Sequence, residues 1–375
     1  MSKSKQSPSG KKIRYGVLGL GHIAQVAILP AFAHAQENSE LRAIFSSDSE
    51  KLEAIGKRYK VPLRASYDEF DNVCSSGELD AVFIALPNHL HRDYTERAAR
   101  AGVHVLCEKP MASSTSDCEA MMKACSAARV KLMIAYRLHF EHASLEAIRI
   151  AQSGTLGEVR YFSSEFSQDV RAGDVRLQKD NGGGTLWDIG IYCLNAARHL
   201  FGAEPVEVSA TVASRKDERF EEVEEMAVAT LHFPGDRIAT FTCSFGAADV
   251  ASYRVVGTDG DLRVEPAFPY TTGLAHELTV GGTKTRRRFP HRDQFAPELL
   301  YFSSCILENR EPEPSGLEGL IDVRIIEALY ESASSGRPVP LDLPHKKDRP
   351  SMELNIHRPP VRNPPEPVNT ESPTE

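Results

Sequence analysis

The chain has 375 residues, 41% of them hydrophobic and 26% charged, and a formal net charge of −8. This length and composition are typical of a globular protein with two domains. A net negative charge repels phosphate backbones and anionic membranes, which argues against nucleic acid and a bilayer as partners.

The polar segment over residues 1–12 is not followed by the apolar run that a secretory signal requires. The seven cysteines form no close pair at a metal-ligand spacing. Together, these observations predict a cytoplasmic protein whose thiols are reduced.

Residues 13–138 alternate between short apolar runs and segments of helical length. We expect strands over 13–18, 41–45, 81–86, 103–107 and 131–135. We expect helices over 23–32, 50–59, 91–101 and 115–128. Strands that alternate with helices predict a parallel, doubly wound sheet of the Rossmann type, so the fold class is α/β. Ser49 is the expected N-cap of the second helix.

The pattern changes near residue 155, where successive strands are separated mainly by turn signals. We expect strands over 160–166, 206–212, 226–233, 237–245, 252–256 and 262–264. We expect helices over 186–200, 294–307 and 317–332. Few helices lie between these strands, which predicts an α+β domain over 139–343 with a large, mostly antiparallel sheet.

The last segment, residues 344–375, is polar and rich in proline. It has too little apolar surface for a core, so we expect an extended tail, in polyproline II or disordered. On that interpretation the tail is dispensable for folding.

A glycine-rich turn follows the first strand, with the sequence Gly19-Leu-Gly21-His22-Ile23-Ala. Gly19 permits the tight turn, and Gly21 lets the backbone approach a pyrophosphate. The helix that starts there offers free N–H groups to the phosphates. The strand–turn–helix order therefore predicts a dinucleotide site that includes His22 and Ile23.

The end of the second strand discriminates between NAD and NADP, because an acidic residue there binds the ribose 2′-hydroxyl of NAD. Ser46 and Ser47 occupy that position, and Lys51 follows. A serine hydroxyl and an ammonium suit a 2′-phosphate. Asp48 comes two residues late, where helix capping is its alternative role. The sequence favours NADP over NAD.

Two segments carry candidate catalytic groups. Glu108 and Lys109 end the strand over 103–107, and the carboxyl ends of parallel strands form the ligand crevice. Asp188 and Tyr192 follow three glycines and are four residues apart, so they share one face of a helix. We expect the three glycines to bring the backbone close to a ligand.

These residues suit the oxidation of an alcohol, which removes a hydride and a proton. Tyr192 can take the proton, because a neighbouring ammonium favours its phenolate form. Lys109 supplies that charge and can hold the reacting oxygen. Asp188 can bind a sugar hydroxyl or orient Lys109. The alternative is a structural Lys109–Asp188 ion pair, with Tyr192 in the core.

The sequence assigns less definite roles to several other residues. Leu86 ends the strand over 81–86, and Asn88 and His91 follow it; we expect all three at the cofactor, with His91 near the nicotinamide. Arg137 either binds ligand or pairs with Glu141. No metal site is expected, because the spacing of the histidines fits no closed zinc set; these are His89, His91, His139 and His142.

Three segments, in this order and at this spacing, resemble the Gfo/Idh/MocA oxidoreductases. They are the Gly19–Gly21 turn, Glu108-Lys109-Pro110, and Gly-Gly-Gly-x-Leu-x-Asp188-x-Gly. The resemblance spans about residues 12 to 340. Tyr192, with Ser46 and Lys51, is most similar to the glucose–fructose oxidoreductase branch.

This resemblance implies a set of properties. The cofactor is NADP, the substrates are cyclic or open sugars, and Lys109, Asp188 and Tyr192 act together. Arg176 lies at the cofactor, and residues 108–110 carry a cis peptide. Subunits pair through their open sheets, as homodimers or homotetramers.

The expected function is that of an NADP-dependent oxidoreductase, which transfers a hydride between nicotinamide and a sugar or polyol carbon. One alternative is a catalytically inactive dinucleotide-sensing or scaffold protein. Among enzymes, a dehydrogenase of the aldose or inositol type that exchanges its cofactor with solvent competes with a sugar–sugar oxidoreductase that keeps it. The sequence leaves this second choice open.

Overall fold

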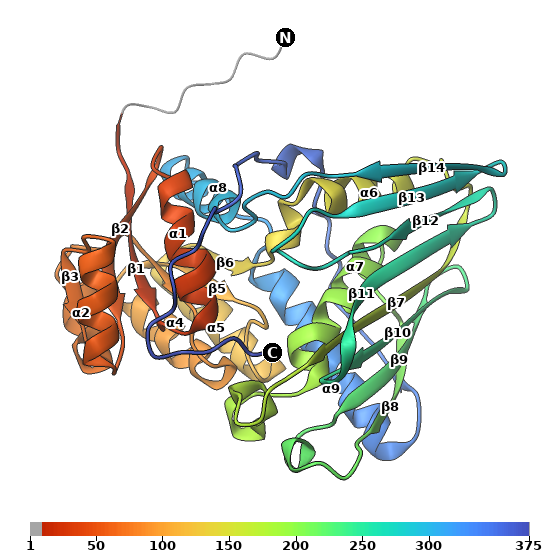
Figure 1. Cartoon of the computed structure of the whole chain (residues 1–375), viewed down its shortest axis with the longest axis horizontal. Coiled ribbons are helices and arrows are strands. Elements are labelled where there is room, and N and C mark those ends of the chain that lie inside the picture. The colour runs from red at the N-terminus through yellow and green to blue at the C-terminus, as the bar shows by residue number, and fades with distance from the viewer. Residues whose placement is uncertain (1–9, 375) are drawn as a thin grey trace.

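The computed structural model describes residues 10–374, which form two sheets, each from one part of the chain (Figure 1). Most of the polar N-terminal segment, residues 1–9, lies outside the described residues. Among the residues described, no helix combines the length and the apolar character needed to cross a membrane.

The first sheet has six strands, all parallel, in the order β3-β2-β1-β4-β5-β6. They are β1 (Ile13–Leu18), β2 (Ser39–Phe45), β3 (Leu63–Ala65), β4 (Ala81–Ile84), β5 (His104–Glu108) and β6 (Leu132–Ala135). The strand order reverses between β1 and β4, which places a ligand crevice at their carboxyl ends. The predicted doubly wound sheet is confirmed. β3 was not predicted, because only three residues form it.

The helices of this half begin with a continuous helical segment over 24–34, of which the central turn is α1 (Leu29–Ala31). The others are α2 (Ser49–Arg58), α3 (Phe70–Ser75), α4 (His91–Arg100) and α5 (Thr115–Ala128); α6 (His142–Gln152) follows them in the chain and packs on the second half. Asp48 caps α2, so the expectation of Ser49 as the N-cap is wrong. The Asp48 carboxylate accepts hydrogen bonds from the backbone N–H groups of Glu50 and Lys51, and Ser49 is the first helical residue.

The second sheet has nine strands in the order β14-β13-β12-β11-β7-β10-β9-β8-β15. They are β7 (Val159–Asp169), β8 (Glu207–Ala213), β9 (Met226–Phe233), β10 (Arg237–Ser244), β11 (Gly246–Gly257), β12 (Gly260–Val264), β13 (Ala275–Val280), β14 (Thr283–Arg288) and β15 (Val339–Pro340). Among the described strands of this second sheet, only β7 and β10 are parallel neighbours, so the predicted mostly antiparallel sheet is confirmed. β13 and β14 were not predicted, because many of their residues are polar and those of β14 are all exposed.

Three helices complete the second half: α7 (Ile191–Phe201), α8 (Ala296–Leu307) and α9 (Gly316–Ser335). α8 packs back on the first sheet, where the Ser303 hydroxyl lies 2.8 Å from the Tyr15 hydroxyl. The Asn38 amide donates to the Leu300 carbonyl at 2.9 Å. The segment 139–343 is therefore not a self-contained unit, because one of its helices covers the first sheet.

The C-terminal tail is extended, with one short helical turn at Met352–Leu354. It is not disordered, however, because it packs on the body. Leu354 is buried, and the Lys346 ammonium is buried against Glu313 at 2.6 Å and Glu318 at 3.2 Å. This contradicts the expectation of a dispensable tail, since its removal would strip buried carboxylates of a cation.

Candidate active site

The glycine-rich turn has the geometry that a dinucleotide needs. Gly19 has φ +88°, and a Cβ there would lie 2.4 Å from the Ala85 carbonyl oxygen, so only glycine fits against β4. At Gly21 a Cβ would meet nothing within 4 Å. This open space, at the start of a helix, fits a pyrophosphate. The next residue, His22, has a buried Nδ1 without a partner among the described residues.

At the end of β2, two serine hydroxyl groups stand at the position of the acid that is typical of NAD sites. The nearby Asp48 carboxylate is used to cap α2. The Ser46 hydroxyl accepts a hydrogen bond from the backbone N–H of Asp48 at 3.1 Å, and Ser47 is exposed. The hydrogen bond from the Lys51 N–H is the main cause that lowers the pKa of Asp48. The half-buried Lys51 side chain forms no ion pair with any described residue.

The centre of the crevice is a clamp around Asp188. The Lys109 ammonium, at the end of β5, donates to Asp188 Oδ1 at 2.9 Å and to its backbone oxygen at 2.8 Å. Arg176 Nε donates to Asp188 Oδ2 at 2.8 Å and is itself held by Asp174. Burial opposes ionisation of Asp188, but the two cations outweigh it and lower its pKa far below the usual range.

Lys109 stays charged in this setting. Burial favours its neutral form, yet Asp188 and then Tyr192 act in the opposite direction, and the pKa of Lys109 is raised. At Glu108 burial dominates and raises the pKa to about 7. The peptide bond between Lys109 and Pro110 is cis, as the family resemblance implies.

Tyr192, on α7, lies beside two cations. The Lys109 ammonium is 4.7 Å from the centroid of its ring, and the Arg137 guanidinium is 4.9 Å from it. Within the described part of the chain, the Tyr192 hydroxyl makes no hydrogen bond, and the residue is only partly buried. The phenol therefore has an unused donor and acceptor next to a fixed ammonium.

Arg137 does not pair with Glu141, so that alternative is wrong. Its guanidinium donates to the Gln294 side chain at 2.5 Å and to the Phe268 carbonyl at 2.8 Å. Glu141 instead caps α6 by accepting from the Ser144 N–H at 2.7 Å. Arg137 is thus fixed by groups more than 130 residues away, which no local sequence signal identifies.

His91 begins α4, as expected, and its position near the nicotinamide stays a prediction. It is fully buried, with Nε2 at 2.8 Å from the Leu86 carbonyl and Nδ1 at 3.0 Å from the Pro110 carbonyl. Both ring nitrogens therefore face backbone oxygens. His91 fastens the end of β4 to the loop after β5, and it cannot reach a substrate proton.

The three glycines over 182–184 are closely packed against protein groups, and the expected approach of a ligand to them stays a prediction. A Cβ at Gly182 would lie 2.7 Å from the Ser113 hydroxyl. At Gly183 it would lie 2.3 Å from the Arg176 carbonyl, and at Gly184 2.4 Å from the Tyr330 hydroxyl.

The glycine loop is joined to the first domain by Asn88, whose side-chain amide donates to the Gly182 carbonyl at 2.8 Å. The Arg176 cation contributes, after burial, to lowering the pKa of His22. The glycine-rich turn and the Asp188 clamp therefore face one crevice.

Ile23 lies beside His22 in the same turn and is only partly buried. Asp174 also contributes to this crevice by holding Arg176, a role that was not predicted from the sequence. The only local signal for this role is that Asp174 lies two residues before Arg176.

A cavity of about 40 Å³ lies behind the clamp, lined by Lys109, Tyr192, His139 and Asn195 among mostly apolar groups. That volume holds a few water molecules at most and is too small for a sugar. A substrate must therefore approach Lys109 and Tyr192 from the crevice.

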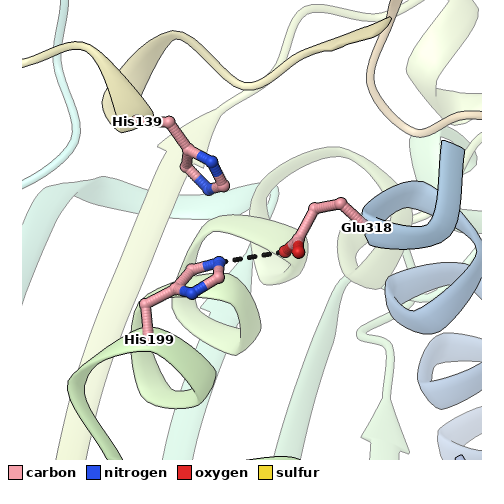
Figure 2. Close-up of side chains that lie close together, drawn as sticks. All are labelled: His139, His199 and Glu318. Carbon is pink, nitrogen blue, oxygen red and sulfur yellow. Dashed lines mark hydrogen bonds and ion pairs between the residues drawn. The ribbon is translucent and has the colours of Figure 1, made fainter. Parts of the chain in front are cut away.

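His139, His199 and Glu318 gather next to this cavity, with potential ligand atoms within 4.8 Å of one another (Figure 2). Glu318, however, already accepts from His199 at 2.9 Å and from Arg198 at 2.6 Å, and Lys346 lies 3.2 Å away. A divalent cation there would be repelled by two fixed cations. The cluster is thus a buried hydrogen-bonded charge network that joins α7, α9 and the tail.

Comparison with known proteins identifies the family to which the chain belongs. A model described as "Oxidoreductase family, NAD-binding Rossmann fold" matches residues 13–136, and the "GFO/IDH/MocA C-terminal domain" matches residues 144–263. The D-xylose 1-dehydrogenase [NADP(+)] of Haloarcula marismortui is 34% identical over 344 residues, which cover 90% of this chain and 95% of the relative.

Solved structures give the same result. The aldose–aldose oxidoreductase from Caulobacter crescentus, complexed with glycerol, is 43% identical with a TM-score of 0.84, and the match covers 88% of this chain and 100% of that chain. A 3-ketoreductase from Actinomadura kijaniata, in complex with NADP and TDP-benzene, is 27% identical with a TM-score of 0.79, covering 86% and 98%.

Proposed function

Because the chain belongs to the Gfo/Idh/MocA oxidoreductase family, we propose that it is an NADP-dependent enzyme that oxidises or reduces a sugar at its anomeric carbon. The observation that carries this proposal is the Lys109–Asp188–Arg176 clamp beside the unpartnered Tyr192 hydroxyl. A catalytically inactive sensing protein would not require charged side chains fixed beside the Tyr192 hydroxyl.

Two positions in the crevice support NADP as the cofactor. The open space at Gly21 would take the pyrophosphate, and the Ser46 hydroxyl and Lys51 ammonium would hold a 2′-phosphate. When bound, the nicotinamide accepts or donates the hydride. Asp48 does not replace the missing acid of NAD sites, because its carboxylate caps α2.

The protein's part is to hold an oxygen and move a proton. Lys109 stays protonated and donates a hydrogen bond to the reacting oxygen, which stabilises negative charge there. Tyr192 exchanges the proton of the same oxygen through its free hydroxyl. Asp188 remains ionised and fixes the direction of Lys109, while Asp174 holds Arg176 on the far side.

The substrate class follows from the relatives. A D-xylose 1-dehydrogenase and an aldose–aldose oxidoreductase, both more than 30% identical, have names that specify aldoses. We therefore favour an aldose over a polyol or a nucleotide-linked sugar. The test is a panel of aldoses and polyols with NADP⁺ and with NAD⁺, followed by NADPH absorbance and product analysis. Tight NADP binding without turnover of any sugar would support the sensing protein instead.

We further propose that the chain forms homodimers through the open face of the nine-stranded sheet. Large apolar side chains on neighbouring strands of this face are exposed: Tyr161 by 48%, Val228 by 44% and Ile238 by 39%. Tyr161 and Ile238 are direct partners in the β7–β10 register. Exposed apolar side chains on one sheet face are typical of a protein interface.

A further inference from the structure

The C-terminal tail leaves the second domain, runs along the first and returns across the space between them (Figure 1). On the first domain its residues contact the helical segment after the glycine-rich turn and the N-terminal end of α2. Beyond these contacts, its last described residues reach the end of β7. The final part, residues 364–374, therefore touches both sides of the crevice.

On the first domain the tail is fastened next to the dinucleotide turn. Gln25, which is buried, accepts a hydrogen bond from the Val368 N–H at 2.7 Å and donates to the Val368 carbonyl at 2.9 Å. The same Gln25 amide donates to the carbonyl of Leu20, inside the glycine-rich turn, at 2.8 Å. One side chain thus connects the tail to the loop that would hold the pyrophosphate.

A second contact lies at the position that would recognise the ribose 2′-substituent. The Asn369 amide donates to Asp48 Oδ2 at 3.1 Å and to Glu50 Oε2 at 3.0 Å. These two carboxylates surround the N-terminus of α2, two to four residues from Ser46. An amide between them offsets part of the negative charge that would otherwise repel a phosphate.

On the second domain the tail is held by backbone pairing. Val170 and Thr374 form an antiparallel bridge, and the Arg171 N–H donates to the Pro373 carbonyl at 2.9 Å. The Arg171 guanidinium also donates to Glu371 at 3.0 Å. Arg171 lies five residues before Arg176, which holds Asp188. The last described residues of the tail therefore lie on the wall of the crevice opposite the glycine-rich turn.

We propose that residues 364–374 form a strap across the crevice, which retains the dinucleotide between catalytic cycles. The proposal rests on the proposed NADP-dependent function. The strap leaves open the space at Gly21 that would take the pyrophosphate, because a Cβ there would meet nothing within 4 Å. Its contacts are with Gln25 behind the turn, with Asp48 and Glu50 at the N-terminus of α2, and with Arg171 on the second domain, so in this proposal it covers a bound dinucleotide instead of displacing it.

Retention has a consequence for the reaction. The hydride and the proton taken from the anomeric C–H and O–H of one aldose leave a lactone, and with a retained cofactor they pass to the carbonyl carbon and oxygen of a second aldose. The second sugar becomes an alditol, and no net oxidant is consumed. The strap thus favours a sugar–sugar oxidoreductase over a dehydrogenase that exchanges its cofactor with solvent.

The test measures the dissociation of NADPH from the full chain and from a variant that ends at Asn363. This variant keeps Lys346 and Leu354, the buried anchors of the tail. Protein loaded with NADPH is mixed with excess NADP⁺, and the loss of NADPH fluorescence gives the dissociation rate. We expect the shortened chain to release NADPH about tenfold faster or more, since lost contacts act mainly on dissociation. Equal rates would overturn the strap.

A point variant provides a matched control that does not depend on the truncation. Asn363 and Asn369 both have positive φ, of 52° and 48°, which glycine tolerates. Only the Asn369 side chain contacts the body among the described residues. Asn369→Gly should accelerate NADPH release about two- to fivefold, and Asn363→Gly should not. Equal behaviour of the two variants would count against the strap.

The same experiment separates failure of the strap from failure of the proposed function. If NADPH binds and sugars turn over, but the full and shortened chains release NADPH at the same rate, only the strap is wrong. If the shortened chain binds NADPH more tightly, the tail competes with the cofactor, and the strap is also wrong. If neither protein binds NADP(H), both proposals fall.

Discussion

Lys109 and Asp188 are joined twice: the ammonium donates to the Asp188 carboxylate at 2.9 Å and to the backbone carbonyl of the same residue at 2.8 Å. The two contacts fix the position of the cation relative to the first turn of the helical segment that carries Tyr192. The ion pair is therefore part of the positioning of the phenol, and the structural and catalytic interpretations of the pair are compatible.

This relationship predicts that Asp188→Asn reduces turnover about tenfold or more. The amide keeps the shape of the side chain but no longer balances Lys109 and Arg176, so the ammonium loses its fixed direction. The matched control is Asp174→Asn, because Asp174 contacts Arg176 and not Lys109. Steady-state kinetics on the best sugar measure both variants, and an equal loss in the two would contradict this role of Asp188.

We expect the cofactor preference to depend on Lys51. We expect wild-type protein to bind NADP more tightly than NAD, and Lys51→Ala to weaken NADP binding about five- to tenfold while NAD binding stays constant. Lys57→Ala is the control, because Lys57 lies in the last turn of the same helix. Titration by calorimetry or fluorescence gives the affinities. Equal wild-type affinities for the two cofactors, unaltered by Lys51→Ala, would contradict the prediction.

The buried end of the tail contributes to stability. Lys346→Met should lower the free energy of unfolding by about 3 kcal/mol, because Glu313 and Glu318 lose a buried cation. Lys347→Met, at the exposed neighbouring position, should change it by less than about 0.5 kcal/mol. Chemical denaturation measures both. Similar values for the two variants would show that Lys346 adds little to the network.

The sheet face predicts the oligomeric state. Ile238→Arg should shift the protein toward the monomer, because a buried arginine would lack a partner in a symmetric interface. Val175→Arg changes an equally exposed apolar residue that lies outside the sheet, and should leave the assembly unchanged. Light scattering after size-exclusion chromatography gives the molar mass. A monomeric wild-type protein, or a dimer in both variants, would contradict the proposed interface.

The sequence predicts the fold well where its signals are local. Apolar runs define most strands of both sheets, and the glycine-rich turn and the segment at Lys109 lie at the carboxyl ends of their strands, as expected. β13 and β14 escaped prediction because strand pairing, and not apolar periodicity, holds their polar residues in place.

The site was predictable only in part, because several of its contacts join distant residues. Arg137 is held by Gln294 and Phe268, and His91 is held by two backbone carbonyls, so neither role can be inferred from neighbours in the sequence. The interpretation of the tail from its composition failed for the same reason. Its composition is that of a disordered segment, yet Lys346 is buried by carboxylates that lie 33 and 28 residues earlier in the chain.

The central claim is that Tyr192 exchanges the substrate proton at an oxygen held by Lys109. Its most direct test is the turnover number of Tyr192→Phe on the best sugar, together with its affinity for NADPH. The ring and its contacts with the two cations remain in this variant, so we predict nearly unchanged NADPH binding. Turnover should fall by about 10² or more, which corresponds to about 3 kcal/mol of transition-state stabilisation. Near-normal turnover of Tyr192→Phe would show that the proton takes another route and would contradict the mechanism.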